Sequence, residues 1–233
     1  MLIFAHRGAS AIEPENTLAA FRAACHANCD GVEFDIHHHD GKLMVIHDRY
    51  LERTTSGSGL LTEHSFNNLR QLDAGKGEII PTLDEVFAVV AKEKLINIEL
   101  KGVSITDIPL LFDYLDKAKA TFSISAKQLL LSSFNHPLLL EIKQQRPEFA
   151  IGALTASLPL GNADFAEQLN AISANIVMDY VNKEFVDDAH ARGLKVYVYT
   201  VDKLPDIKAL KRIGVDGIFA NNPKQAKKLL SQC

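Results

Sequence analysis

Ionisable side chains in this chain follow short apolar runs, at the points where strands of a sheet would end. His6-Arg7-Gly8 comes straight after the apolar run 2–5. The imidazole of His6 titrates near neutral pH, Arg7 presents a planar fork of donors that suits phosphate oxygens, and Gly8 lets the backbone turn tightly. An isolated triplet of this kind is common on protein surfaces, so its meaning depends on the polar residues further along the chain.

Acidic residues with strand spacing form the second element of the predicted site. Glu33 and Asp35 are separated by one residue, and Glu99 and Lys101 repeat this spacing. Residues two apart in a strand point to the same face, so the members of each pair lie on one side of the sheet. Three carboxylates that converge at one height are typical ligands of a hard cation such as Mg²⁺ or Ca²⁺. We therefore predict a divalent-cation site formed by Glu33, Asp35 and Glu99.

The elements that must position these residues follow from an alternation of apolar strands and helix-period stretches. Eight such units in 233 residues fit a compact (β/α)₈ barrel, the TIM barrel, as one domain over residues 1–233. The alternative is a doubly wound open sheet, which would usually carry a Gly-rich dinucleotide loop after its first strand, and this chain has none there. The predicted strands cover 2–6, 31–37, 95–100, 129–134, 150–154, 175–180, 195–201 and 216–220, and the helices lie near 16–28, 82–93, 106–119, 136–146, 162–171, 182–192, 203–213 and 223–231.

Residues 38–80 interrupt the alternation and carry a second histidine, His47. The sequence around Asp40-Gly41 predicts a hairpin that returns the run 43–47 antiparallel to the second strand. A Ser/Gly-rich stretch, a short helix near 65–73 and a loop up to Pro81 follow. We predict that this segment is an insertion on the C-terminal rim of the barrel, where substrate contacts are built.

The length of the hairpin loop sets the direction of the His47 side chain. A three-residue loop over 39–41 would pair His38 with Lys42 and Glu33 with His47, so that His47 faces the cation. A two-residue loop would shift the register by one and turn His47 to the opposite face. We expect the three-residue loop.

Composition and charge exclude several classes of function. The formal net charge is −4, and the sequence contains no basic field for a nucleic acid. The first residues lack a basic segment of the kind that opens a secretory signal, and no apolar run is long enough to span a bilayer. We expect a cytoplasmic protein with a small-molecule substrate, no nucleic-acid partner and no stable membrane insertion; its oligomeric state is left open.

Taken in order, the motifs resemble those of the glycerophosphodiester phosphodiesterase family over nearly the whole chain. The resemblance implies a TIM-barrel enzyme that hydrolyses deacylated phospholipids to sn-glycerol 3-phosphate and an alcohol. It implies that His6 and His47 are the acid/base pair, that Glu33, Asp35 and Glu99 hold a divalent cation, and that Arg7 and Lys101 bind phosphate. The motifs that carry the resemblance are His6-Arg7-Gly8, Pro14-Glu15-Asn16-Thr17, Glu33-Phe34-Asp35, His47-Asp48, Ile80-Pro81-Thr82-Leu83 and Glu99-Leu100-Lys101.

The chain departs from the family pattern near its C-terminal end. It has Tyr199-Thr200-Val201-Asp202 where the family commonly has Trp-Thr-Val-Asn, and Ala220-Asn221 where the family often has Thr-Asp. Tyr199 keeps an aromatic wall for the glycerol end of a substrate, and Phe134 is a second candidate for such a wall. Glu15, in the first loop of the predicted mouth, is expected to orient His6 or Arg7.

Two other functions are compatible with such a barrel. One is a related phosphodiesterase that acts on intact phospholipid, which would need an apolar or basic rim facing the membrane. The predicted insertion offers only Tyr50 and Phe66 as aromatic residues for this. The other is a barrel that binds without catalysis, which would be expected to have lost at least one of the ionisable groups named above.

Overall fold

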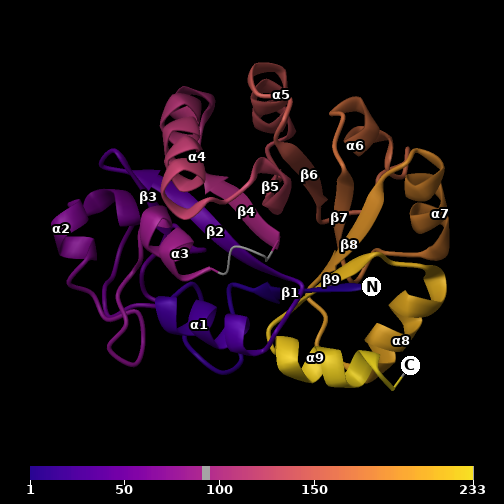
Figure 1. Cartoon of the computed structure of the whole chain (residues 1–233), viewed down its shortest axis with the longest axis horizontal. Coiled ribbons are helices and arrows are strands. Elements are labelled where there is room, and N and C mark those ends of the chain that lie inside the picture. The colour runs from indigo at the N-terminus through magenta and orange to yellow at the C-terminus, as the bar shows by residue number, and fades with distance from the viewer. Residues whose placement is uncertain (91–94, 233) are drawn as a thin grey trace.

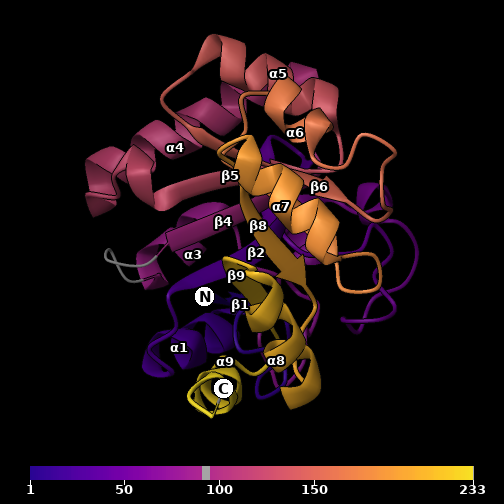
Figure 2. The ribbon, with the colours of Figure 1, turned by 90° about the vertical axis from the view of Figure 1, so that its right-hand side faces the viewer.

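The computed structural model describes residues 1–90 and 95–232, and within them eight parallel strands close into a barrel. The barrel closes because β1 pairs with both β2 and the last strand, β9. This confirms the predicted (β/α)₈ fold, with helices outside the strands (Figures 1 and 2). The barrel strands are β1 (Leu2–His6), β2 (Gly31–His39), β4 (Leu95–Gly102), β5 (Leu129–Ser133), β6 (Ala150–Thr155), β7 (Ser173–Val177), β8 (Lys195–Tyr199) and β9 (Gly217–Ala220).

The helices lie close to the predicted positions, with differences at their ends. Thr17 caps α1 by accepting a hydrogen bond from the backbone N–H of Ala20. The predicted helix 82–93 begins as expected but ends at Val89, since the backbone of Val90 is extended; the predicted residues 91–93 lie outside the described residues. The predicted helix 162–171 is shorter, at five residues. The helices are α1 (Leu18–His26), α2 (Phe66–Leu69), α3 (Leu83–Val89), α4 (Ile108–Phe122), α5 (His136–Gln145), α6 (Asp164–Gln168), α7 (Lys183–Ala191), α8 (Leu204–Ile213) and α9 (Pro223–Leu230).

The barrel is packed by apolar side chains on both sides of its strands. The main core lies between the strands and the helices, where Phe34 of β2 packs edge-on against Phe21 of α1. A smaller cluster inside the barrel contains Phe4, Tyr197 and Phe219. These rings fill the interior, so the ionisable side chains lie nearer to the C-terminal ends of the strands, as TIM barrels require of their active sites.

The hairpin between β2 and β3 (Lys42–Val45) has a two-residue loop, so the expected three-residue loop is wrong. His39 pairs with Lys42, and Asp40 and Gly41 have φ angles of 51° and 67°. Positive φ at both loop residues is the geometry of a type I′ turn, whose twist matches that of the flanking strands and which Asp-Gly favours. The turn preference of this dipeptide decides the register.

The expected link between register and the direction of His47 is also wrong. The backbone N–H of Ile46 still donates to the carbonyl of Asp35, at 3.1 Å, but the strand has ended at Val45. His47 therefore no longer follows the alternation of the ladder, and its side chain lines the barrel mouth. Its carbonyl oxygen is held by Nε2 of His37 at 3.0 Å, and the His37 ring fits only because residue 102 is glycine, where a Cβ would lie 2.1 Å from the ring.

The rest of the rim insertion packs on the barrel through its own small core. This core consists of Met44, Ile46, Leu51, Leu61, Leu69, Ala74 and Ile80. Arg70 ties the insertion to α3 through two hydrogen bonds to Glu85, of 2.6 and 2.7 Å, and a third to the carbonyl of Ile80. Figure 1 shows α2 and β3 at one edge of the barrel. Among the described residues, no helix has the length and apolar character needed to cross a membrane.

Candidate active site

A cavity of about 460 Å³ opens at the C-terminal mouth of the barrel and brings most of the predicted site residues together. Eight of them line it: His6, Arg7, Glu33, His47, Glu99, Lys101, Phe134 and Tyr199. Asp35 and Glu15 lie behind this lining and contact Arg7. Asn97, Leu154, Thr200 and Phe219 also line the cavity. Sequence reasoning missed these four because each is an ordinary strand or loop residue with no chemical signal of its own.

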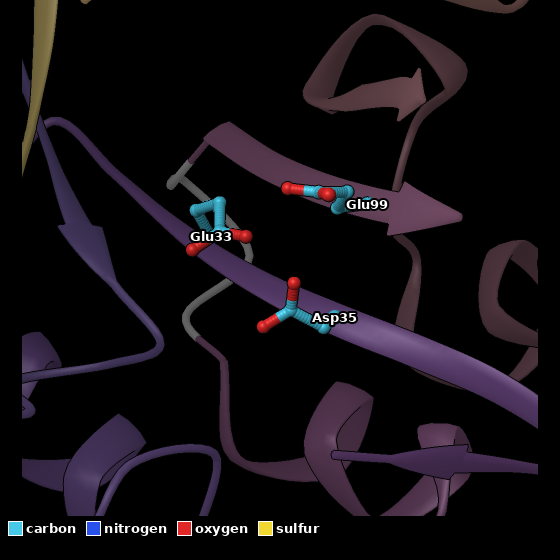
Figure 3. Close-up of side chains that lie close together, drawn as sticks. All are labelled: Glu33, Asp35 and Glu99. Atoms are coloured by element: carbon cyan, nitrogen blue, oxygen red, sulfur yellow. The ribbon is translucent and has the colours of Figure 1, made fainter. Parts of the chain in front are cut away.

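Three carboxylates gather between β2 and β4, where Asp35 and Glu99 are direct neighbours in the sheet register (Figure 3). One oxygen from each of Glu33, Asp35 and Glu99 lies within 4.8 Å of the other two. Burial and the neighbouring carboxylates raise the pKa of Glu33 well above its ordinary value, and they raise the pKa of Glu99 to about 7. Within the described residues, Oε1 of Glu33 is buried without a hydrogen-bond partner. This oxygen-rich cluster is suited to a hard divalent cation.

Two basic side chains lie beside the carboxylates. Arg7 donates its backbone N–H to Glu33, at 2.9 Å, and its Nε lies 3.4 Å from Asp35. Lys101 places Nζ 2.9 Å from Glu99 Oε1 and 4.0 Å from Asp35 Oδ1. Both cations line the same cavity, so they can bind an anionic group that enters it.

His6 is held at the end of β1 by a residue from the opposite end of the chain. Its Nδ1 lies 2.8 Å from Oδ1 of Asn221, and its Nε2 lies 4.0 Å from Glu33 Oε2. Burial lowers the pKa of His6 to about 4, and the positive charge of Arg7 contributes to this shift. His6 is therefore neutral at physiological pH and can accept a proton.

His47 is the first member of a chain of contacts across the mouth. Its Nδ1 lies 2.5 Å from Oδ1 of Asp48, and Asp48 also accepts a hydrogen bond from Arg53. Arg53 makes two further hydrogen bonds, of 2.8 Å each, to Glu15, and Glu15 accepts another hydrogen bond from Arg7 at 3.0 Å. The hydrogen bond from Arg53 lowers the pKa of Asp48 to about 2, so Asp48 is a carboxylate beside the His47 ring.

Glu15 thus contacts Arg7, and the expected role of Glu15 in orienting His6 or Arg7 stays a prediction. Burial would raise the pKa of Glu15, but hydrogen bonding and the charges of Arg53 and Arg7 outweigh it and lower the pKa. Sequence reasoning did not find Arg53. It lies in the loop-rich insertion, where no periodicity predicts which way a side chain points.

Two aromatic rings form one wall of the cavity. Phe134 and Tyr199 meet edge to face with ring centroids 6.2 Å apart, and Lys101 Nζ lies 5.6 Å from the centre of the Phe134 ring. The hydroxyl of Tyr199 donates to the carbonyl of Thr155 at 2.8 Å, which fixes the position of the ring in the cavity wall.

The fold and the polar mouth together define a TIM-barrel enzyme whose site combines acidic, basic and imidazole groups. Residues 6–225 match the model of the glycerophosphoryl diester phosphodiesterase family. A glycerophosphodiester phosphodiesterase of Caldanaerobacter subterraneus subsp. tengcongensis is 35% identical over 96% of this chain and 95% of its own length. The chain belongs to the glycerophosphoryl diester phosphodiesterase family, a family of enzymes.

Another relative and a solved structure agree with this assignment. A glycerophosphodiester phosphodiesterase of Bacillus altitudinis is 35% identical, with 97% of both chains covered. The structure of an Oleispira antarctica phosphodiesterase in complex with the product sn-glycerol-3-phosphate matches with a TM-score of 0.89. It is 30% identical, and the match covers 99% of this chain and 97% of that one.

Proposed function

We propose that this enzyme hydrolyses glycerophosphodiesters to sn-glycerol 3-phosphate and an alcohol, with a divalent cation, Mg²⁺ or Ca²⁺, and two histidines. The observation that carries the proposal is the placement of two imidazoles, two cationic side chains and a three-carboxylate cluster around one cavity. Phosphodiester cleavage needs a proton acceptor, a proton donor and positive charge for the phosphoryl oxygens. The product bound in the related Oleispira antarctica structure supports this substrate class.

Glu33, Asp35 and Glu99 would hold the cation. One oxygen of each lies within 4.8 Å of the other two, and Oε1 of Glu33, which is buried without a hydrogen-bond partner among the described residues, is suited to bind a cation. When bound, the cation supplies positive charge to phosphoryl oxygens and offsets the mutual repulsion of the three carboxylates. Arg7 and Lys101 complete the positive surface and would orient the phosphate.

The two histidines divide the proton transfers. The neutral His6 removes the proton of the glycerol 2-hydroxyl, whose oxygen attacks phosphorus while the P–O bond to the alcohol breaks. His47 gives its proton to the departing alcohol oxygen. Burial lowers the pKa of His47, and the carboxylates of Asp35 and Asp48 act against this shift by favouring the charged ring. An attacking group within the substrate gains the large effective concentration that positioning confers.

The second half of the reaction reverses these roles. His47, now neutral, takes a proton from water as the water oxygen attacks the cyclic phosphate, and the bond from phosphorus to the 2-oxygen breaks. His6 returns its proton to that oxygen, which releases sn-glycerol 3-phosphate and restores both rings. Phe134 and Tyr199 would pack against the carbon atoms of the glycerol.

The proposal is tested by measuring sn-glycerol 3-phosphate release from a panel of glycerophosphodiesters, with a lysophospholipid as comparator. We expect exhaustive chelation to abolish release, Mg²⁺ or Ca²⁺ to restore it, and His6→Ala or His47→Ala to reduce kcat by about 10²-fold or more. His26→Ala, an exposed histidine of α1, is the matched control. Full activity after chelation, or equal turnover of the lysophospholipid, would contradict the proposal. A substrate that lacks the 2-hydroxyl should not be cleaved; normal cleavage would instead indicate direct attack by water.

A further inference from the structure

We propose that Asp202 is a positioning residue that fixes the ring proton of His6 on Nδ1 by holding the side-chain amide of Asn221. The inference rests on the proposed role of His6 as a proton acceptor. Asp202 lies just after β8, and the described residues that line the active-site cavity do not include it. It lines a neighbouring groove together with His6 and Asn221, so it would act through these residues rather than on the substrate.

The carboxylate of Asp202 is anchored at both of its oxygens. Oδ1 accepts hydrogen bonds from the backbone N–H groups of Asn221 and Asn222, at 2.8 and 3.3 Å. Oδ2 accepts a hydrogen bond from the side-chain Nδ2 of Asn221, at 2.7 Å. The carboxylate therefore has a fixed position at the start of α9. Because it can only accept hydrogen bonds, the group of Asn221 that faces it must be a donor.

This requirement for a donor determines which end of the Asn221 amide faces His6. With Nδ2 on Asp202, Oδ1 lies 2.8 Å from Nδ1 of His6 and 3.0 Å from Oγ of Ser10. If the amide were reversed, its oxygen would lie about as close to the carboxylate oxygen with no proton between them. That arrangement is repulsive, so the carboxylate excludes it.

The orientation of the amide in turn determines the tautomer of His6. An amide oxygen carries no proton, so the hydrogen bond to it must use a proton on Nδ1 of the ring. A neutral imidazole carries only one such proton, which leaves the lone pair on Nε2, the nitrogen nearer the acidic cluster at 4.0 Å from Glu33. This is the tautomer that can accept a proton from a substrate in the cavity.

The hydrogen bonds that run from Asp202 through Asn221 to His6 form a relay, and this relay also keeps a formal negative charge away from the His6 ring. The group in contact with His6 is a neutral amide, and the carboxylate stands one residue further out. The amide orients the ring through its hydrogen bond to Nδ1, and no further anion contacts the ring there beside the three carboxylates of the mouth.

The experiment replaces Asp202 by asparagine and reads the His6 tautomer from the ring ¹⁵N chemical shifts, together with kcat and KM. In Asp202→Asn two amide donors face each other, and rotation of the Asn221 amide relieves the conflict. Its Nδ2 then faces Nδ1 of His6, and the ring proton moves to Nε2. We expect this shift together with a loss in kcat of about 10- to 100-fold and an unchanged KM. This loss is at or below the lower end of the range for a lost general base, because the ring itself remains. Asp206→Asn, which removes a carboxylate from the first turn of α8, should change neither reading.

An exchange variant, Asp202→Asn with Asn221→Asp, supplies the decisive rescue. The amide at position 202 donates to the carboxylate at position 221, which again accepts the proton from Nδ1 of His6. We expect the Nδ1–H tautomer and most of kcat to return. A folded Asp202→Asn protein that keeps this tautomer and wild-type kcat would overturn the proposal, as would a folded exchange variant without recovery. If Asp202→Asn does not fold, Asp202→Ala is read in its place, because it also removes the carboxylate that holds the Asn221 amide.

The two proposals fail in different ways. Full turnover by His6→Ala would remove His6 from the chemistry, but the ring shifts of the Asp202 variants would still show whether Asp202 sets the tautomer. Loss of turnover by His6→Ala together with unchanged shifts in Asp202→Asn would remove the relay alone.

Discussion

Replacing Glu99 by glutamine should stabilise the metal-free protein at alkaline pH while weakening its response to a cation. Burial and the charge of Asp35 raise the pKa of Glu99 from 4.5 to about 7 in the folded state. The folded state therefore holds this proton more tightly than the unfolded chain does, and its contribution to stability is lost as the pH rises from 4.5 through 7. The shift corresponds to about 3 kcal/mol at pH 8, because one pKa unit is worth about 1.4 kcal/mol.

The neutral glutamine avoids this loss, so its advantage should appear only at the higher pH. At about 2–4 °C per kcal/mol for a chain of this length, metal-free Glu99→Gln should melt about 6–12 °C above wild type at pH 8 and close to it at pH 4.5. Glu184→Gln, on the exposed first turn of α7, is the matched control and should not change the melting temperature. Added Mg²⁺ or Ca²⁺ should then stabilise the wild type more than Glu99→Gln, because the cation binds the ionised carboxylates.

Thermal unfolding by circular dichroism in chelator, from pH 4.5 to 8, measures the first effect, and titration of the cation measures the second. If metal-free Glu99→Gln melts no higher than wild type at pH 8, ionisation of Glu99 does not destabilise the folded protein as its burial and the charge of Asp35 imply. If both proteins gain equally from the cation, Glu99 is not one of its ligands.

Three further substitutions test the supports of the site. Asp48→Asn should lower kcat by about tenfold or more and change KM less, because His47 loses a charged partner at 2.5 Å. Unchanged steady-state rates would exclude a role of Asp48 in supporting His47. Arg70→Ala should make the rim insertion more sensitive to limited proteolysis, because three hydrogen bonds, two of them to Glu85, are lost; an unaltered cleavage rate would contradict this. Gly8→Ala should destabilise the fold by more than about 1 kcal/mol in urea unfolding, because φ is +77° and a Cβ would lie 2.7 Å from the α1 backbone; wild-type stability would refute the inferred clash.

The sequence determined the architecture because its signals are local and repeated. Each strand is a short apolar run, and each helix has its own period and capping residues, so the order of elements could be predicted without knowledge of contacts. The positions of Glu33, Asp35 and Glu99 followed for the same reason. The alternation of side chains along a strand is fixed by the backbone, and neighbouring parallel strands end at the same rim of a barrel.

Only the tertiary structure decided how the histidines are held. Asn221 and His6 are 215 residues apart in sequence, and they meet only because β9 closes the barrel against β1. Arg53 joins Asp48 to Glu15 across a rim segment with no periodic pattern. The direction of His47 likewise depended on where β3 ends, and not on the hairpin register alone. Local backbone geometry is written in short stretches of sequence, whereas contacts between loop residues exist only after the chain has closed on itself.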